Sequence, residues 1–96
     1  MDESENTILM CKECGDKRQQ DWQKKNIHTI IEVGDFVKIP FKEDKEIEHM
    51  WVIVQEVGEI FIGKLDNEPI VLTDYKLGDT VNFTKKDIED LSKGGN

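Results

Sequence analysis

The sequence is short of cysteine and of long apolar runs, and each shortage excludes a class of protein. Only two of its 96 residues are cysteine, which is too few for a scaffold built on disulfide bonds. No segment approaches the roughly 20 consecutive apolar residues that a membrane-spanning helix requires. The first residues, MDESENT, are acidic and polar, whereas a secretory signal peptide begins with basic residues. We therefore expect a cytoplasmic protein that does not bind membranes.

Positive charge is also scarce. The chain carries 13 basic and 21 acidic residues, a formal net charge of −8. The imbalance lies in residues 27–96, which contain fifteen acids and eight bases. An acidic body repels the phosphate backbone of DNA and RNA, so we expect no nucleic-acid binding. The charge favours either a protein partner with a basic surface or simply high solubility.

The length limits the chain to one small hydrophobic core. Residues 1–26 are mostly polar and contain a Cys-x-x-Cys pair. We predict that this N-terminal segment is partly disordered, or that Asp16 caps a marginal helix whose only apolar residue is Trp22. Residues 27–96 are predicted to form a single compact domain.

From residue 28 onward, β-branched and aromatic runs alternate with turn-forming residues. These runs predict short strands at residues 28–33, 36–39, 49–57, 59–65, 70–72 and 80–83. The run MWVIV has no polar residue in alternation, which indicates burial on both faces of a sheet. The charged stretch 42–48 is predicted to be a solvated loop. Gly63 would permit a bend or a close approach of two backbones.

The end of the chain carries the signature of a helix start. Thr84 can cap residues 85–93, with Asp87 at the third position, and Ile88 and Leu91 would share one face. The predicted fold is therefore α+β. It has about five short, mostly antiparallel strands in a twisted sheet or a partly closed small barrel, followed by a short C-terminal helix.

Cys11 and Cys14 are spaced like the two thiolate ligands of a zinc knuckle. A complete structural zinc site needs four ligands. The two histidines, His28 and His49, do not stand at the spacing of a common zinc finger, although a homodimer could supply four cysteines. Two cysteines three positions apart also occur by chance. Zinc is therefore a candidate cofactor with an incomplete site in one chain.

His49 stands at the start of the longest apolar run. Alternate residues of a strand share a face, so His49 would lie beside Trp51. Catalysis by this histidine would require a nucleophile or an orienting carboxylate within reach. The only serines, Ser4 and Ser92, lie in the terminal segments, so we expect that the protein is not an enzyme.

The segments EHMWV, GKLDNEP, LGDTV and DIED follow one another in an order that resembles the YegJ-like family of small bacterial domains of unknown function. The resemblance covers about residues 36–91. It implies a compact, sheet-containing domain without an assigned activity. Members of that family often have a tryptophan after the last aspartate of DIED, whereas this chain has Leu91. The matching positions are Glu48, His49, Met50, Trp51, Gly63, Leu65, Asn67, Pro69, Gly78, Asp79, Val81, Ile88 and Asp90.

Two hypotheses for the function come from different classes. In the first, Glu48, His49, Trp51 and Asn67 line a surface of a non-enzymatic binding module that recognises a protein, a peptide or a small ligand. In the second, the acidic body is an inhibitor or immunity-type protein that covers a basic site on a partner, by imitating nucleic-acid charge. In either case we expect a monomer or a weak homodimer.

Overall fold

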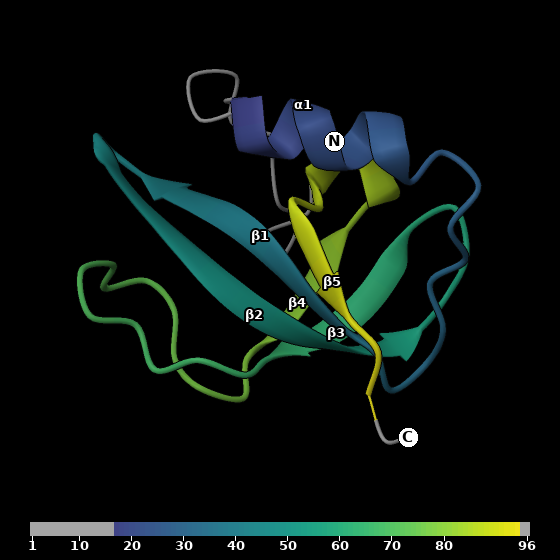
Figure 1. The fold of residues 1–96 in the computed structure, drawn as a ribbon. Coiled ribbons are helices and arrows are strands. Elements are labelled where there is room, and N and C mark those ends of the chain that lie inside the picture. Colours follow the sequence, from purple (N-terminus) through teal and green to yellow (C-terminus); the bar gives the residue numbers. More distant parts are fainter. Residues whose placement is uncertain (1–16, 95–96) are drawn as a thin grey trace.

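Five strands and one α-helix make up residues 17–94, the part of the chain that the computed structural model describes (Figure 1). The strands form one antiparallel sheet in the order β4-β3-β2-β1-β5. The elements are α1 (Lys17–Lys25), β1 (Phe36–Glu43), β2 (Glu46–Glu56), β3 (Phe61–Leu65), β4 (Thr80–Phe83), the 3-10 turn η1 (Lys85–Asp87) and β5 (Asp90–Ser92).

The sheet is open, with β4 and β5 at its two edges, so the expectation of a partly closed barrel is wrong. The expectation of a C-terminal helix is also wrong. After Thr84 the chain makes only the short turn η1, and then it extends into β5, where Leu91 pairs with Val37 of β1. The one α-helix among residues 17–94 is α1, close to the N-terminus.

The C-terminal segment is extended because two effects compete there: a local signal for the start of a helix, and pairing with the edge of β1. The capping box between Thr84 and Asp87 does form, and it starts a turn. However, Ile88 is fully buried in the core, and the next backbone N–H, from Glu89, donates to the carbonyl oxygen of Lys38 at 2.8 Å. Pairing with β1 satisfies backbone groups that would otherwise be left at an edge, and it overrides the helix propensity of these residues.

Two predicted strands and one predicted loop also differ from the structure. Residues 28–33 and 70–72 lie in loops, whereas the charged stretch 42–48 belongs to β1 and β2. A two-residue turn at Asp44 and Lys45 joins these strands, and Asp44 adopts a φ of 59° there. Aspartate tolerates this left-handed conformation better than most residues, which allows the hairpin to close tightly.

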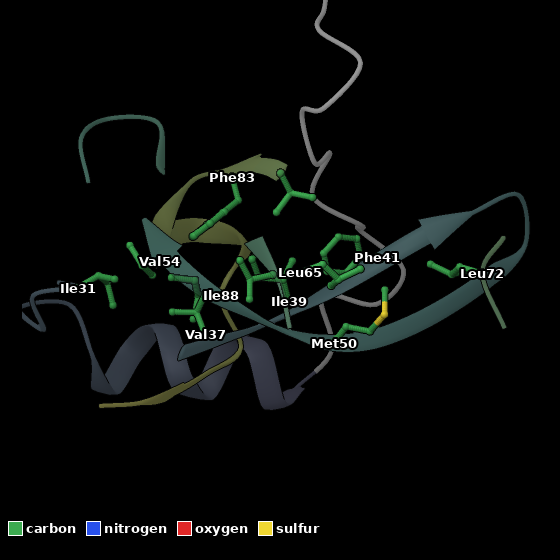
Figure 2. Packing of buried hydrophobic residues seen from close by; sticks show 12 residues of the cluster. Ile31, Val37, Ile39, Phe41, Met50, Val54, Leu65, Leu72, Phe83 and Ile88 are labelled. Carbon is green, nitrogen blue, oxygen red and sulfur yellow. The ribbon is translucent and has the colours of Figure 1, made fainter. Parts of the chain in front are cut away.

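The hydrophobic core lies on one face of the sheet only. Along β2, Met50, Val52 and Val54 are buried, while the residues between them remain partly exposed. The prediction that MWVIV is buried on both faces is therefore wrong. Figure 2 shows the side chains of this core, which come from β1 to β4 and from the connecting segments: Ile31, Val37, Ile39, Phe41, Met50, Val52, Val54, Leu65, Leu72, Val81, Phe83 and Ile88.

Helix α1 is joined to the sheet by polar side chains as well as by Trp22, which packs against the core. The Nε2 of Gln23 donates to the carbonyl oxygens of Lys85 and Ile88, both at 2.8 Å. The Nε2 of Gln19 donates to the carbonyl oxygen of Asp87 at 3.1 Å. The helix thus covers η1, and it gains from tertiary contacts the stability that nine residues lack by themselves.

Candidate functional site

The face of the sheet opposite the core carries the candidate site. His49 and Trp51 of β2 lie on this face, and both are partly exposed. Across the β1–β2 ladder, His49 is opposite Pro40 and Trp51 is opposite Lys38. The alternation of side chains along β2 therefore places the histidine and the tryptophan next to each other, as the sequence pattern predicts.

A buried carboxylate holds the ring of His49. The Nδ1 atom of His49 lies 2.6 Å from Oε2 of Glu89, a residue that immediately precedes β5. The side chain of Glu89 is 0% exposed, and that of His49 is 32% exposed. Because β1 lies between β2 and β5, the glutamate side chain reaches across β1 to meet the histidine.

This contact fixes the orientation of the imidazole. A carboxylate accepts hydrogen bonds, so Nδ1 is the donor of the pair. Within residues 17–94 the second ring nitrogen, Nε2, has no hydrogen-bond partner. The ring therefore presents Nε2 as the polar group available to a ligand. The other carboxylate oxygen, Oε1 of Glu89, is buried and has no hydrogen-bond partner among the described residues.

Trp51 is held by its backbone and is flanked by a charge. Its N–H donates to Oδ1 of Asn67, and its carbonyl oxygen accepts from the N–H of Asp66 at 2.9 Å. Since β3 ends at Leu65, the Asn67 side chain replaces the acceptor that the next residue of a strand would supply. The Nζ of Lys38 lies 5.8 Å from the centroid of the Trp51 ring, within the range of a cation–π contact.

Glu48 lies elsewhere, although the sequence hypothesis groups it with His49. Its carboxylate accepts hydrogen bonds from the N–H groups of Ile70 (2.8 Å), Val71 (3.0 Å) and Leu72 (3.1 Å). The N–H groups of Ile70 and then of Leu72 have the largest effects and lower the pKa of Glu48; burial opposes them, and the N–H of Val71 lowers the pKa further. Glu48 thus anchors the loop between β3 and β4.

Glu43 anchors the following residues of the same loop. It accepts hydrogen bonds from the hydroxyl and the N–H of Thr73, both at 2.7 Å. These two bonds, the hydroxyl first, lower the pKa of Glu43. Consecutive backbone N–H groups of the loop are therefore satisfied by two carboxylates of the β1–β2 hairpin, which together stabilise a segment without regular structure.

The structure therefore brings together His49, Trp51 and, through a backbone hydrogen bond, Asn67. It adds two residues that the sequence analysis does not name, Glu89 and Lys38. Glu89 lies 40 positions from His49, inside a segment that the sequence predicts to be helical; the resemblance includes it in the segment DIED, but nothing local pairs it with His49. Lys38 could be found only by pairing β1 with β2 in the correct register.

The predicted zinc ligands, Cys11 and Cys14, lie outside the described residues. Among residues 17–94, no group of three or more His, Cys, Asp or Glu side chains is placed to hold a metal ion. A search of the same residues finds no helix long and apolar enough to cross a membrane.

Comparison with known proteins identifies the family. Residues 16–93 match the family described as "Uncharacterized protein conserved in bacteria (DUF2314)", and the chain belongs to this family. Over 78 residues it is 33% identical to a protein of Neisseria meningitidis serogroup B named "Putative ankyrin repeat protein". The match covers 76% of this chain and 30% of that relative, so the chain spans less than a third of the relative's length. No solved structure matches.

Proposed function

We propose that this chain is a non-enzymatic binding module, and that the face bearing His49, Trp51 and Lys38 contacts the ligand. The observation that carries the proposal is the fixed ring of His49. A fully buried carboxylate orients a partly exposed imidazole, whose Nε2 has no other partner among residues 17–94. Ordering this ring before the ligand arrives reduces the entropic cost of binding.

The chemistry of the three side chains defines the ligand class. The Trp51 ring offers a flat apolar contact, and Lys38 lies beside it with a positive charge. With Nδ1 donating to Glu89, the Nε2 of the neutral His49 ring is a hydrogen-bond acceptor. A small molecule or peptide side chain that combines a flat apolar group, a carboxylate for Lys38 and a hydrogen-bond donor for Nε2 matches these features. The family assignment to uncharacterised bacterial proteins leaves this ligand class open.

A catalytic role has less support, although His49 has the orienting carboxylate that catalysis would require. Among residues 17–94, no hydroxyl group forms a hydrogen bond with its ring. Activation of a nucleophile of the protein by this histidine would need such a hydroxyl group within hydrogen-bond reach of the ring. Recognition requires only the fixed ring and the adjacent tryptophan.

The test is a nuclear magnetic resonance titration with matched probes. One set consists of small aromatic carboxylates that also carry a hydroxyl group as a hydrogen-bond donor, and the control set consists of the corresponding neutral amides with the same hydroxyl group. We expect the carboxylates to shift the signals of the Trp51 indole and the His49 ring, and the amides to shift them much less. Replacing Trp51→Ala should abolish the shift of the His49 ring signals. His28→Ala should leave it unchanged, because His28 is exposed in the turn after α1. Equal responses to carboxylates and amides would contradict the proposal.

The hypothesis of an acidic cover for a basic partner has weaker support. Two of the acids that it would use, Glu43 and Glu48, bind backbone N–H groups of the protein itself. Both the narrower YegJ-like assignment and the cytoplasmic location stay predictions.

A further inference from the structure

Five aliphatic side chains at one end of the molecule are exposed to solvent. They are Ile27 (68% exposed), Ile30 (74%), Val33 (62%), Val57 (52%) and Ile60 (53%). We call this set the apolar end. Single exposed aliphatic residues are normal, but a contiguous apolar patch of several hundred Å² on a protein marks an interaction site.

These residues come from two segments that lie beside each other. The first segment is the loop between α1 and β1, and the second is the β2–β3 hairpin (Figure 1). The N–H of Gly34 donates to the carbonyl oxygen of Val54 at 2.9 Å, which places Val33 next to the end of β2. The Nζ of Lys85 donates to the carbonyl oxygens of Ile27 and Thr29 at 3.0 and 2.8 Å.

Lys85 also connects the loop to the hairpin. It follows β4 closely, and the last residue of β4, Phe83, pairs with Phe61 of β3. Ile60 precedes Phe61 directly. The backbone pairing therefore brings Ile60 to the same end of the sheet as Ile27.

Side-chain hydrogen bonds hold the loop in place. The Nζ of Lys93 lies 2.6 Å from Oδ2 of Asp35 and 3.5 Å from the carbonyl oxygen of Ile30. Oδ2 of Asp35 also accepts from the N–H of Glu32 at 2.9 Å. The loop therefore presents its aliphatic side chains outward from a backbone that is already ordered, and this reduces the entropic cost of an interface.

Opposite charges flank the apolar end. Lys24 and Lys25, both exposed, end helix α1 and stand two or three positions before Ile27. On the hairpin side, the exposed acids Glu56 and Glu59 adjoin Val57 and Ile60 in the chain. A surface with a basic margin and an acidic margin is complementary to itself when a second copy is turned by a two-fold axis.

We propose that the apolar end is the contact surface of a homodimer. In this dimer, Lys24 and Lys25 of one protomer face Glu56 and Glu59 of the other, and the aliphatic side chains meet at the two-fold axis. Five aliphatic side chains with their charged margins form a contact near the lower size limit for specific interfaces, about 600 Å² per protomer. The dimer is therefore weak, with a Kd of roughly 10–100 µM.

Ile70, an exposed isoleucine outside the apolar end, has different surroundings. Ile70 is more exposed than any residue of the apolar end, at 90%. It lies in the loop held by Glu48 and Glu43, where Asp44, Glu46 and Glu68 are also close in the chain or across the hairpin turn. Two copies meeting there would bring acids of the same sign together, which opposes self-association.

The test is sedimentation velocity of the full chain from about 1 µM to about 1 mM at low salt. The wild-type protein should convert from monomer to dimer within this range. The variant Ile30→Asp should stay monomeric, with an unchanged circular dichroism spectrum that shows it is folded. The matched control, Ile70→Asp, introduces the same charge at an exposed isoleucine outside the apolar end, and it should dimerise like the wild type.

A charge exchange tests the arrangement itself. The double variant Lys24→Glu/Lys25→Glu should lose the dimer, and so should Glu56→Lys/Glu59→Lys. An equimolar mixture of the two should form a heterodimer, because an all-acidic margin then meets an all-basic one at both contacts. A wild-type protein that remains monomeric at the highest concentration would overturn the proposal. Equal losses in the two aspartate variants, or a mixture that stays monomeric, would also overturn it.

Discussion

Replacing Gly63 with alanine should destabilise the sheet at a point where two strands approach closely. Gly63 of β3 is opposite Val54 of β2, beside a bulge in the ladder. A Cβ atom at this position would lie 2.5 Å from Cγ1 of Val52 and 2.7 Å from the carbonyl oxygen of Ile53. Ordinary contacts between carbon atoms lie at about 3.5–4.0 Å, so a displacement of about 1 Å is required.

Neither neighbour can move freely. Val52 is fully buried, and the carbonyl oxygen of Ile53 belongs to the backbone of the central strand β2. Overpacking of a core costs about 1–3 kcal/mol. The loss of unfolded-state freedom on changing glycine to alanine returns about 0.4–1 kcal/mol. We therefore expect Gly63→Ala to lower the free energy of unfolding by about 1–2 kcal/mol net.

Thermal and urea unfolding would measure this change. For a domain of this size, 1 kcal/mol corresponds to a fall of about 4–8 °C in Tm. The control is Gly58→Ala, because a Cβ there would meet only the carbonyl oxygen of Ile60, at 3.5 Å. It should change the stability by less than about 0.5 kcal/mol. The double variant Gly63→Ala/Val52→Ala should lose less stability than the sum of the losses of the two single variants, because truncating Val52 removes one of the clashes. A stability of Gly63→Ala equal to that of the control would refute the reasoning.

Three further predictions concern polar groups. Gln23→Ala removes two hydrogen bonds between α1 and η1 and should cost about 1–2 kcal/mol in unfolding, measured against the exposed control Lys24→Ala. Burial raises the pKa of Asp87, so its ionised form weakens the folded state above that pKa. Asp87→Asn should therefore raise the Tm at pH 7, and the gain should shrink as the pH falls; a constant gain would contradict this cause. Hydrogen bonds lower the pKa of Glu48 and Glu43, so the stability that they contribute is present at neutral pH and is lost as the pH falls through their lowered pKa values. The amide signals of residues 70–74 should shift together in that range, and Glu48→Gln should remove the transition for the first part of the loop.

Part of the candidate site could be predicted from the sequence, because it depends on local periodicity. The alternation of a strand places His49 beside Trp51 whatever the rest of the fold does. A glycine inside a predicted strand likewise indicates a close approach of two backbones, as at Gly63. Glu89 could not be predicted in the same way. Its role depends on the order of the strands, because its side chain reaches across β1. Its Oε2 atom then lies 2.6 Å from Nδ1 of His49, a residue 40 positions away in the chain.

The N-terminal helix illustrates the opposite limit. Its sequence shows one apolar residue, Trp22, and the expectation of a marginal helix rests on that. The structure joins the helix to the sheet through two glutamines that donate to backbone carbonyl oxygens of η1 and its surroundings. Hydropathy patterns register apolar burial, and they do not register a buried amide that is satisfied by a distant backbone group.

The sequence by itself determined the approximate positions of β1 to β4, the neighbours His49 and Trp51, and the acidic character of the body. These properties depend on residues close together in the chain. The tertiary structure decided the fate of the C-terminal segment, which is extended because the edge of β1 offers backbone partners and the core takes in Ile88. It also decided that Glu48 anchors a loop while Glu89 orients His49. The chain has many glutamates with the same side chain, and local sequence does not distinguish their roles. Only the register of the strands determines which of them reaches a given partner.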